Sequence, residues 1–135
     1  MKSLFLATLL IFGLSQAAVA SESSEKSYVS YCSNYSYGNQ AVSYAFSSCV
    51  NTNFNSLGRD FDTPIYISYC SNFGNTVSYS FVSCINNNFS RLARELNRSI
   101  YLPHCGNYNQ NELSYSFISC ANDNFRRIKF ELDNQ

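Results

Sequence analysis

Six cysteines are the residues of this chain with the most evident chemistry, and they occur as three similar pairs. Each second cysteine opens the pattern Cys-x-Asn-x-Asn-Phe. An even number of cysteines behind an export signal predicts three disulfides. Pairing between neighbouring copies would keep a constant spacing of 21 residues but would strand Cys32 and Cys120. Pairing within copies leaves no thiol over, and we favour it. The three expected bonds are Cys32–Cys49, Cys70–Cys84 and Cys105–Cys120.

Other chemistry is poorly supported by the residue types and their spacing. A structural zinc site would use closely spaced Cys-x2–4-Cys pairs, and the chain has none. The single histidine, His104, takes the place of Tyr31 and Tyr69 in the other copies, which favours a packing role. The carboxylates near loops are Asp60, Asp62 and Glu112, and their spacing reveals no acid–base pair. We therefore predict no catalytic residue, no metal site and no cofactor.

Asparagine recurs in every copy at two positions after the second cysteine. Asn53, Asn88 and Asn124 each lie one helical turn past that cysteine and on its face. A polar side chain on a buried face needs hydrogen-bond partners. We predict a structural role, in which each amide bonds a backbone group of an adjacent turn or hairpin. The alternative is a row of amides lining a groove for sugar or peptide.

The chain contains 11 tyrosines, a residue type that is common on adaptable binding surfaces. Most of them recur in two or three copies, and we interpret this recurrence as a sign of packing. Tyr37 is unique to the long first loop. It is therefore the best single candidate for a ligand contact.

The second half of each copy has the periodicity of a helix. The second copy shows a three-to-four spacing that predicts a long, widely buried helix, with Val77, Phe81, Cys84, Ile85, Asn88, Leu92 and Leu96 in its stripe. Asn75 or Thr76 could cap its start.

The first half of each copy allows two interpretations. Tyr66, Tyr69, Cys70 and Phe73 follow a helical spacing, which favours a short helix. Ile65, Ile67 and Tyr69 also alternate, as in a strand. Pro103 fits poorly inside a helix.

These patterns predict an all-α protein built from three tandem, disulfide-linked helical-hairpin repeats in a small stack. An α+β fold of strand–helix repeats is the alternative. The repeats span residues 27–64, 65–99 and 100–135, within one domain of residues 21–135. Residues 1–20 have the basic start, apolar stretch and small final residues of a secretory signal peptide.

Charge and compartment narrow the function. Without Lys2 the chain has one more acidic than basic residue, so it has no surplus positive charge that would attract nucleic acid. We expect a secreted or periplasmic protein with no integral membrane segment after signal cleavage. The predicted function is a non-enzymatic, disulfide-stabilised module that binds protein or glycan, or is structural. The alternative is a small secreted hydrolase or toxin that uses Asp and Glu residues.

Overall fold

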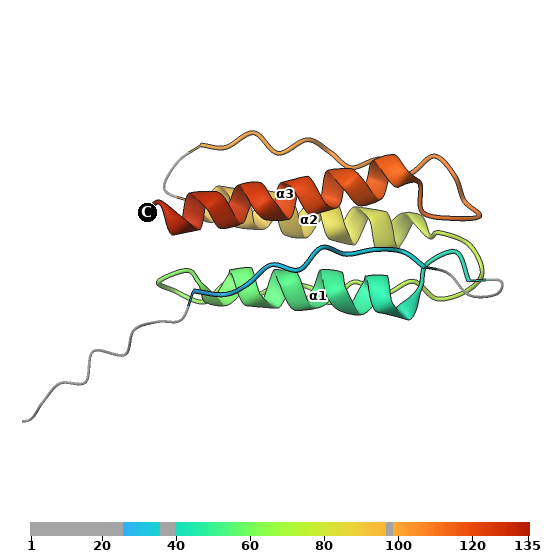
Figure 1. The fold of residues 1–135 in the computed structure, drawn as a ribbon, viewed down its shortest axis with the longest axis horizontal. Coiled ribbons are helices and arrows are strands. Elements are labelled where there is room, and N and C mark those ends of the chain that lie inside the picture. Colours follow the sequence, from blue (N-terminus) through green and yellow to red (C-terminus); the bar gives the residue numbers. More distant parts are fainter. Residues whose placement is uncertain (1–25, 36–39, 97–98) are drawn as a thin grey trace, which may run out of the picture.

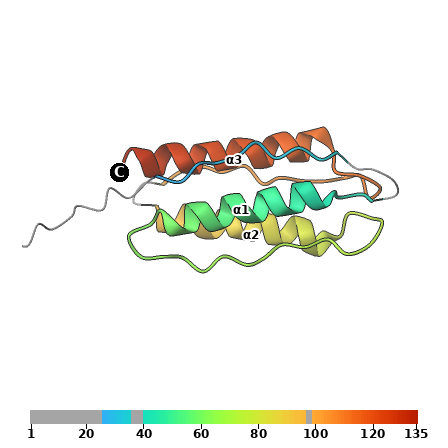
Figure 2. The same ribbon diagram turned by 60° about the horizontal axis from the view of Figure 1, so that its bottom comes forward.

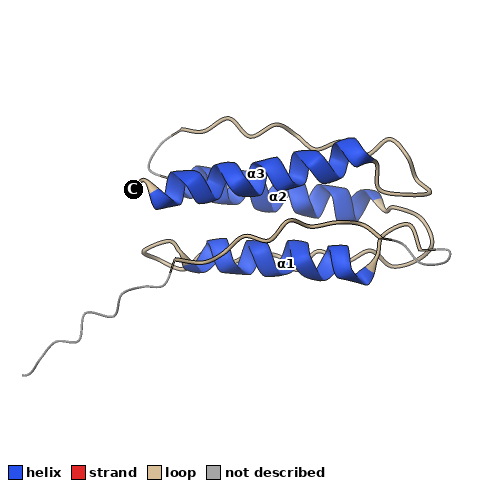
Figure 3. Ribbon diagram, in the orientation of Figure 1, coloured by secondary structure: helices blue, strands red, loops and turns tan. Residues whose placement is uncertain are grey.

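The computed structural model describes residues 26–35, 40–96 and 99–135, and this part of the chain contains three α-helices and no strand. The helices are α1 (Tyr44–Arg59), α2 (Tyr79–Glu95) and α3 (Tyr115–Asp133). All three run in the same direction, from right to left in Figure 1. An extended segment precedes each helix and runs beside it in the opposite direction (Figures 1 and 3). We call these extended segments 1, 2 and 3, which are residues 26–35, 64–73 and 99–109. The all-helical class and the three-copy organisation are confirmed.

A serine begins each helix. The side chains of Ser43, Ser78 and Ser114 accept a hydrogen bond from the backbone N–H three residues later, at 3.1–3.2 Å. This bond satisfies one of the amide groups that has no partner within the first helical turn. The true cap of α2 is therefore Ser78, and the prediction of Asn75 or Thr76 was wrong.

Three phenylalanines from different helices form the tightest layer of the core. The ring centroids of Phe54, Phe89 and Phe125 are 4.7–4.8 Å apart, and all three side chains are buried. A second phenylalanine layer lies two turns nearer the helix starts, and one aliphatic layer separates the two. A further aliphatic layer follows toward the helix ends. The second phenylalanine layer is Phe46, Phe81 and Phe117. The aliphatic layer between the two phenylalanine layers is Val50, Ile85 and Ala121, and the layer toward the helix ends is Leu57, Leu92 and Ile128. The predicted apolar stripe of α2 thus faces a core that all three copies share.

The extended segments correct the prediction for the first half of each copy. Extended segment 2 contains neither the short helix predicted from Tyr66, Tyr69, Cys70 and Phe73 nor a strand, and the same holds for the other two. Each copy is therefore an extended segment joined to a helix, not a helical hairpin. The reason is that asparagine side chains of the helices supply hydrogen bonds that a helix or a sheet would have provided.

One set of asparagines joins each helix to the extended segment of the next copy. Asn51 of α1 accepts a bond from the Cys70 N–H and donates one to the Cys70 carbonyl, both at 2.7 Å. Asn86 of α2 bonds Cys105 in the same way, at 2.8 and 2.9 Å. Each of these amides also donates to the carbonyl one turn earlier in its own helix. We call Asn51, Asn86 and Asn122 the inter-copy asparagines.

The third inter-copy asparagine closes the three copies into a ring. Asn122 of α3 accepts from the Cys32 N–H at 2.7 Å and donates to the Cys32 carbonyl at 2.9 Å. Extended segment 1 accordingly lies against α3 as well as against its own helix (Figure 2). Each helix also contacts both of the others. The copies therefore form a closed three-helix bundle with approximate threefold symmetry, and the third copy has two neighbours like the others.

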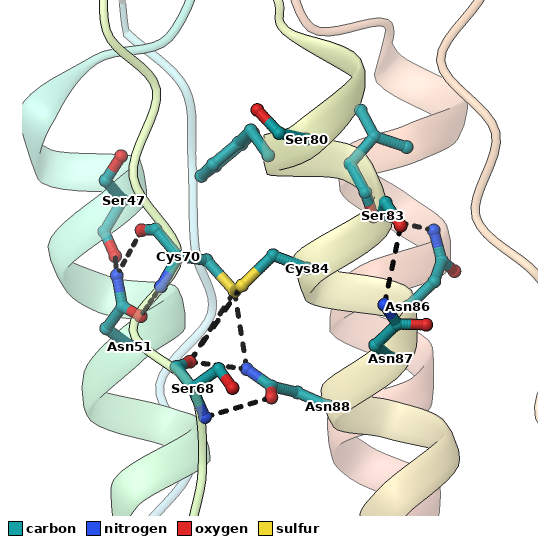
Figure 4. The surroundings of a disulfide bond; sticks show 12 residues. Ser47, Asn51, Ser68, Cys70, Ser80, Ser83, Cys84, Asn86, Asn87 and Asn88 are labelled. Atoms are coloured by element: carbon teal, nitrogen blue, oxygen red, sulfur yellow. Dashed lines mark hydrogen bonds between the residues drawn. A yellow bond between two sulfur atoms is a disulfide. The ribbon is translucent and has the colours of Figure 1, made fainter.

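A disulfide and a second asparagine tie each extended segment to its own helix. All six cysteines are paired, as Cys32–Cys49, Cys70–Cys84 and Cys105–Cys120. The closed loops span 14–17 residues, and each contributes about 3 kcal/mol in the chain-entropy model. Beside the second bond, Asn88 accepts from the Ser68 N–H at 3.2 Å and donates to the Ser68 carbonyl at 2.7 Å (Figure 4).

Candidate binding surface

All ten tyrosines in the described part of the chain are exposed, with 61–98% of each residue accessible to solvent. The interpretation of the recurring tyrosines as packing residues was therefore wrong. Water-exposed aromatic rings on this scale offer a large amphipathic contact area, because each ring pairs an apolar face with a hydroxyl. The ten are Tyr28, Tyr31, Tyr35, Tyr44, Tyr66, Tyr69, Tyr79, Tyr101, Tyr108 and Tyr115.

The extended segments present seven of these rings, because the inner side of each segment is already occupied. In extended segment 2, Ile67 packs against the core and Cys70 is fully buried, whereas Tyr66 and Tyr69 are exposed. Val29 and Leu102 take the place of Ile67 in the other segments. The spacing of the tyrosines therefore marks the outer side of an extended chain, not one face of a helix.

Near the starts of the helices, exposed aromatic residues occupy equivalent positions in the three copies. Each set of three contains the first residue of one helix and two residues of the extended segment that belongs to the next copy. The inter-copy asparagine of that helix bonds the same extended segment. Each member is exposed. The sets are Tyr44 with Tyr69 and Phe73, Tyr79 with His104 and Tyr108, and Tyr115 with Tyr31 and Tyr35.

The first of these sets lines a groove of about 480 Å³ between α1 and extended segment 2. Its remaining lining is mostly polar and includes Gln40, Ser47 and Asn75, with Val42 as an aliphatic side chain. None of the described residues that line it is charged. Gly74 lines the same groove with a φ of 108°, a conformation that favours glycine. The volume falls within the usual range of small-ligand sites, about 300–1,000 Å³.

A larger groove of about 740 Å³ lies between α3 and extended segment 3, and both of its arginines are already engaged. Arg126 pairs with Asp123, and Arg127 donates to the Tyr101 carbonyl at 3.4 Å. Near the end of α3, Asp133 pairs with Lys129 and Lys26. The hydrogen bond from Lys129 is the main reason why the pKa of Asp133 is lowered, and the charges of both lysines add to it.

The carboxylates that sequence analysis considered do not meet. Asp60 and Asp62 follow the end of α1, whereas Glu112 precedes the start of α3. Because the helices are parallel, these positions lie at opposite ends of the bundle (Figure 1). Asp60 instead lines a small pocket of about 130 Å³ with Lys26 and Asp133 near the helix ends.

The other candidate residues have clear positions, with one exception. His104 is exposed, so it is not the packing residue that its position suggested. Among residues 26–35, 40–96 and 99–135, no group of three potential metal ligands lies together, and no helix is long and apolar enough to span a membrane. Tyr37, the tyrosine singled out as a ligand contact, lies outside the described residues.

The buried asparagines include one with an unpaired oxygen. Asn53 and Asn88 each make two bonds to the backbone of a serine, Ser30 and Ser68. Asn124 makes only one, to the Pro103 carbonyl at 2.9 Å, since proline has no N–H to donate. Its Oδ1 is buried without a partner in the described structure.

A third set of asparagines, Asn34, Asn72 and Asn107, was not singled out from the sequence. Each accepts a 2.7 Å bond from the N–H of the capping serine that follows it, although 6–9 residues separate the two. Their recurrence two positions after the first cysteine was the available signal.

Comparison with protein-family models, with curated proteins and with solved structures finds no match to this chain. The function must therefore be argued from the geometry above.

Proposed function

We propose that this protein is an exported, non-enzymatic binding module that presents its tyrosines to a protein or glycan partner. The observation that carries the proposal is the exposure of all ten described tyrosines on a bundle fixed by three disulfides. Rings held on a rigid framework lose little conformational freedom when a ligand binds, so more of the contact energy is available for affinity.

Export is part of the proposal and has two supports. Three disulfides persist in oxidising compartments, such as the periplasm or the exterior. The signal peptide proposed for residues 1–20 would deliver a domain of residues 21–135 there, although residues 1–20 lie outside the described structure. The lack of surplus charge favours a neutral partner over nucleic acid.

A paired affinity capture tests this function. The oxidised protein and a triple variant, Tyr44→Ser with Tyr79→Ser and Tyr115→Ser, are immobilised and exposed to the native envelope fraction or medium. Because the three rings are exposed, the variant should keep the melting temperature of the wild type. The wild type should retain a partner that the variant releases. Equal retention by both proteins, or no retention by either, would refute the proposal.

A further inference from the structure

We propose that the groove between α1 and extended segment 2 is a binding site for a neutral saccharide. We define this site, the Tyr44–Phe73 groove, by Tyr44, Tyr69, Phe73, Gln40, Ser47 and Asn75. The proposal rests on the binding function above, and it names both the site and the chemical class of the ligand.

The aromatic part of the groove suits the faces of sugar rings. The C–H groups on one face of a pyranose carry partial positive charge, and the face of an aromatic ring is negative. Tyr44, Tyr69 and Phe73 are 79%, 67% and 88% exposed, so a ligand can reach their rings. Phe73 is the most telling of the three, because it has no hydroxyl and so gains little from contact with water.

The polar part of the groove suits hydroxyl groups. Gln40 and Asn75 are exposed amides, and each offers donors as well as an acceptor. Ser47 adds a hydroxyl that can donate or accept. A ligand rich in hydroxyls needs this mixture of donors and acceptors.

The absence of charge in the groove excludes several other ligand classes. No described residue that lines the groove is Asp, Glu, Lys, Arg or His, so a carboxylate, a phosphate or an ammonium group would lose hydration without gaining an ion pair from these residues. The engaged arginines of the groove beside α3 make that site a poorer candidate for the same ligand. A flat protein partner would normally bury about 800 Å² per side, whereas this groove has the size of a small-ligand site.

A printed array of neutral and acidic oligosaccharides, probed with the oxidised protein, tests the inference. The protein should bind neutral glycans. Tyr69→Ala and Phe73→Ala should each weaken binding about fivefold to tenfold, in line with the usual strength of one aromatic contact. Phe73→Tyr should bind like the wild type, because tyrosine occupies the equivalent position in the other two copies. Phe130→Ala, which removes an exposed aromatic ring of α3 outside the groove, is the matched control and should have no effect.

Three results would overturn the inference: no binding to any glycan, binding to acidic glycans alone, or equal binding by the wild type and the groove variants. The capture experiment above separates this failure from that of the wider proposal. If the array is negative but the wild type still retains a native partner that the tyrosine variant releases, the binding function stands and the saccharide site does not. If both experiments are negative, both proposals fail.

Discussion

Three consecutive asparagines in α2 allow the hydrogen bonds of the extended segments to be tested by substitution. Asn86 holds Cys105 of the next copy, Asn88 holds Ser68 of its own copy, and Asn87 between them is exposed. Figure 4 shows Asn88 directed toward Ser68, whereas Asn87 lies on another side of α2, beside Ser83. The three substitutions to alanine therefore share one helix and one chemical change.

Each substitution should change the free energy of unfolding by a different amount. Asn86→Ala leaves both backbone groups of buried Cys105 without their partner, and an unpaired buried group costs about 1–3 kcal/mol. The better helix propensity of alanine returns up to about 0.7 kcal/mol. We expect a net loss of about 2–4 kcal/mol for Asn86→Ala. For Asn88→Ala we expect about 1–3 kcal/mol, because Ser68 is only partly buried and water can reach it. Asn87→Ala should be neutral or slightly stabilising.

Thermal unfolding followed by far-ultraviolet circular dichroism, with the disulfides intact, measures these differences. At this chain length each kcal/mol shifts the melting temperature by roughly 4 °C. Asn86→Ala should therefore melt roughly 8–16 °C below the wild type, and Asn87→Ala at or just above it. Equal melting temperatures for the Asn86 and Asn87 variants would refute the reasoning, because they would mean that the inter-copy bonds contribute nothing to stability.

Four further outcomes follow from the same structure. Asn124→Ala should lower the melting temperature less than Asn53→Ala, because Asn124 makes one backbone bond and Asn53 makes two. In a Pro103→Ser background the serine N–H can donate the second bond to Asn124, so Asn124→Ala should lower the melting temperature more than it does in the wild type. Phe89→Ala should destabilise the bundle by about 3–5 kcal/mol in denaturant unfolding, because it opens a cavity in the three-phenylalanine layer. Alkylation without reductant should add no mass to the purified protein, and one labelled thiol would contradict three complete disulfides. Because the pKa of Asp133 is lowered in the folded state, its ion pairs stabilise the protein above the ordinary aspartate pKa, and this contribution is lost as the pH falls through the folded value. Asp133→Asn should accordingly lower the melting temperature slightly at neutral pH but not in strong acid, and a constant difference across that range would be inconsistent with the ion pairs.

Repetition made part of this fold predictable. Comparison of the three copies aligned the helices, and the apolar stripe of α2 was read correctly, since Phe81, Ile85 and Leu92 are fully buried. Local spacing suffices for such predictions because a helix satisfies its own backbone. The pairing of cysteines within copies follows from the same logic and agrees with the structure.

The extended segments could not be read in the same way, because their backbone partners are side chains far along the chain. Cys70 is held by Asn51, and Cys32 is held by Asn122, which lies 90 residues away. A helical spacing of tyrosines was misleading here, since these residues face water and report nothing about the buried side. Ring closure was also hidden, because a linear repeat does not reveal whether its last unit meets its first. The visible warnings against a helix were Pro103 and the alternation of Ile65, Ile67 and Tyr69.

Tyrosine nitration mapped by mass spectrometry tests the central claim, that the exposed tyrosines form a ligand-binding surface. For the isolated oxidised protein, we expect modification at all ten described tyrosines. When the native envelope fraction or medium is added, tyrosines of this surface should be protected, and Tyr44 and Tyr69 of the Tyr44–Phe73 groove should be among them. If all ten tyrosines react equally with and without that material, or fail to react in the isolated protein, the tyrosine surface is not the binding surface. Protection of other tyrosines without Tyr44 and Tyr69 would contradict the Tyr44–Phe73 groove alone.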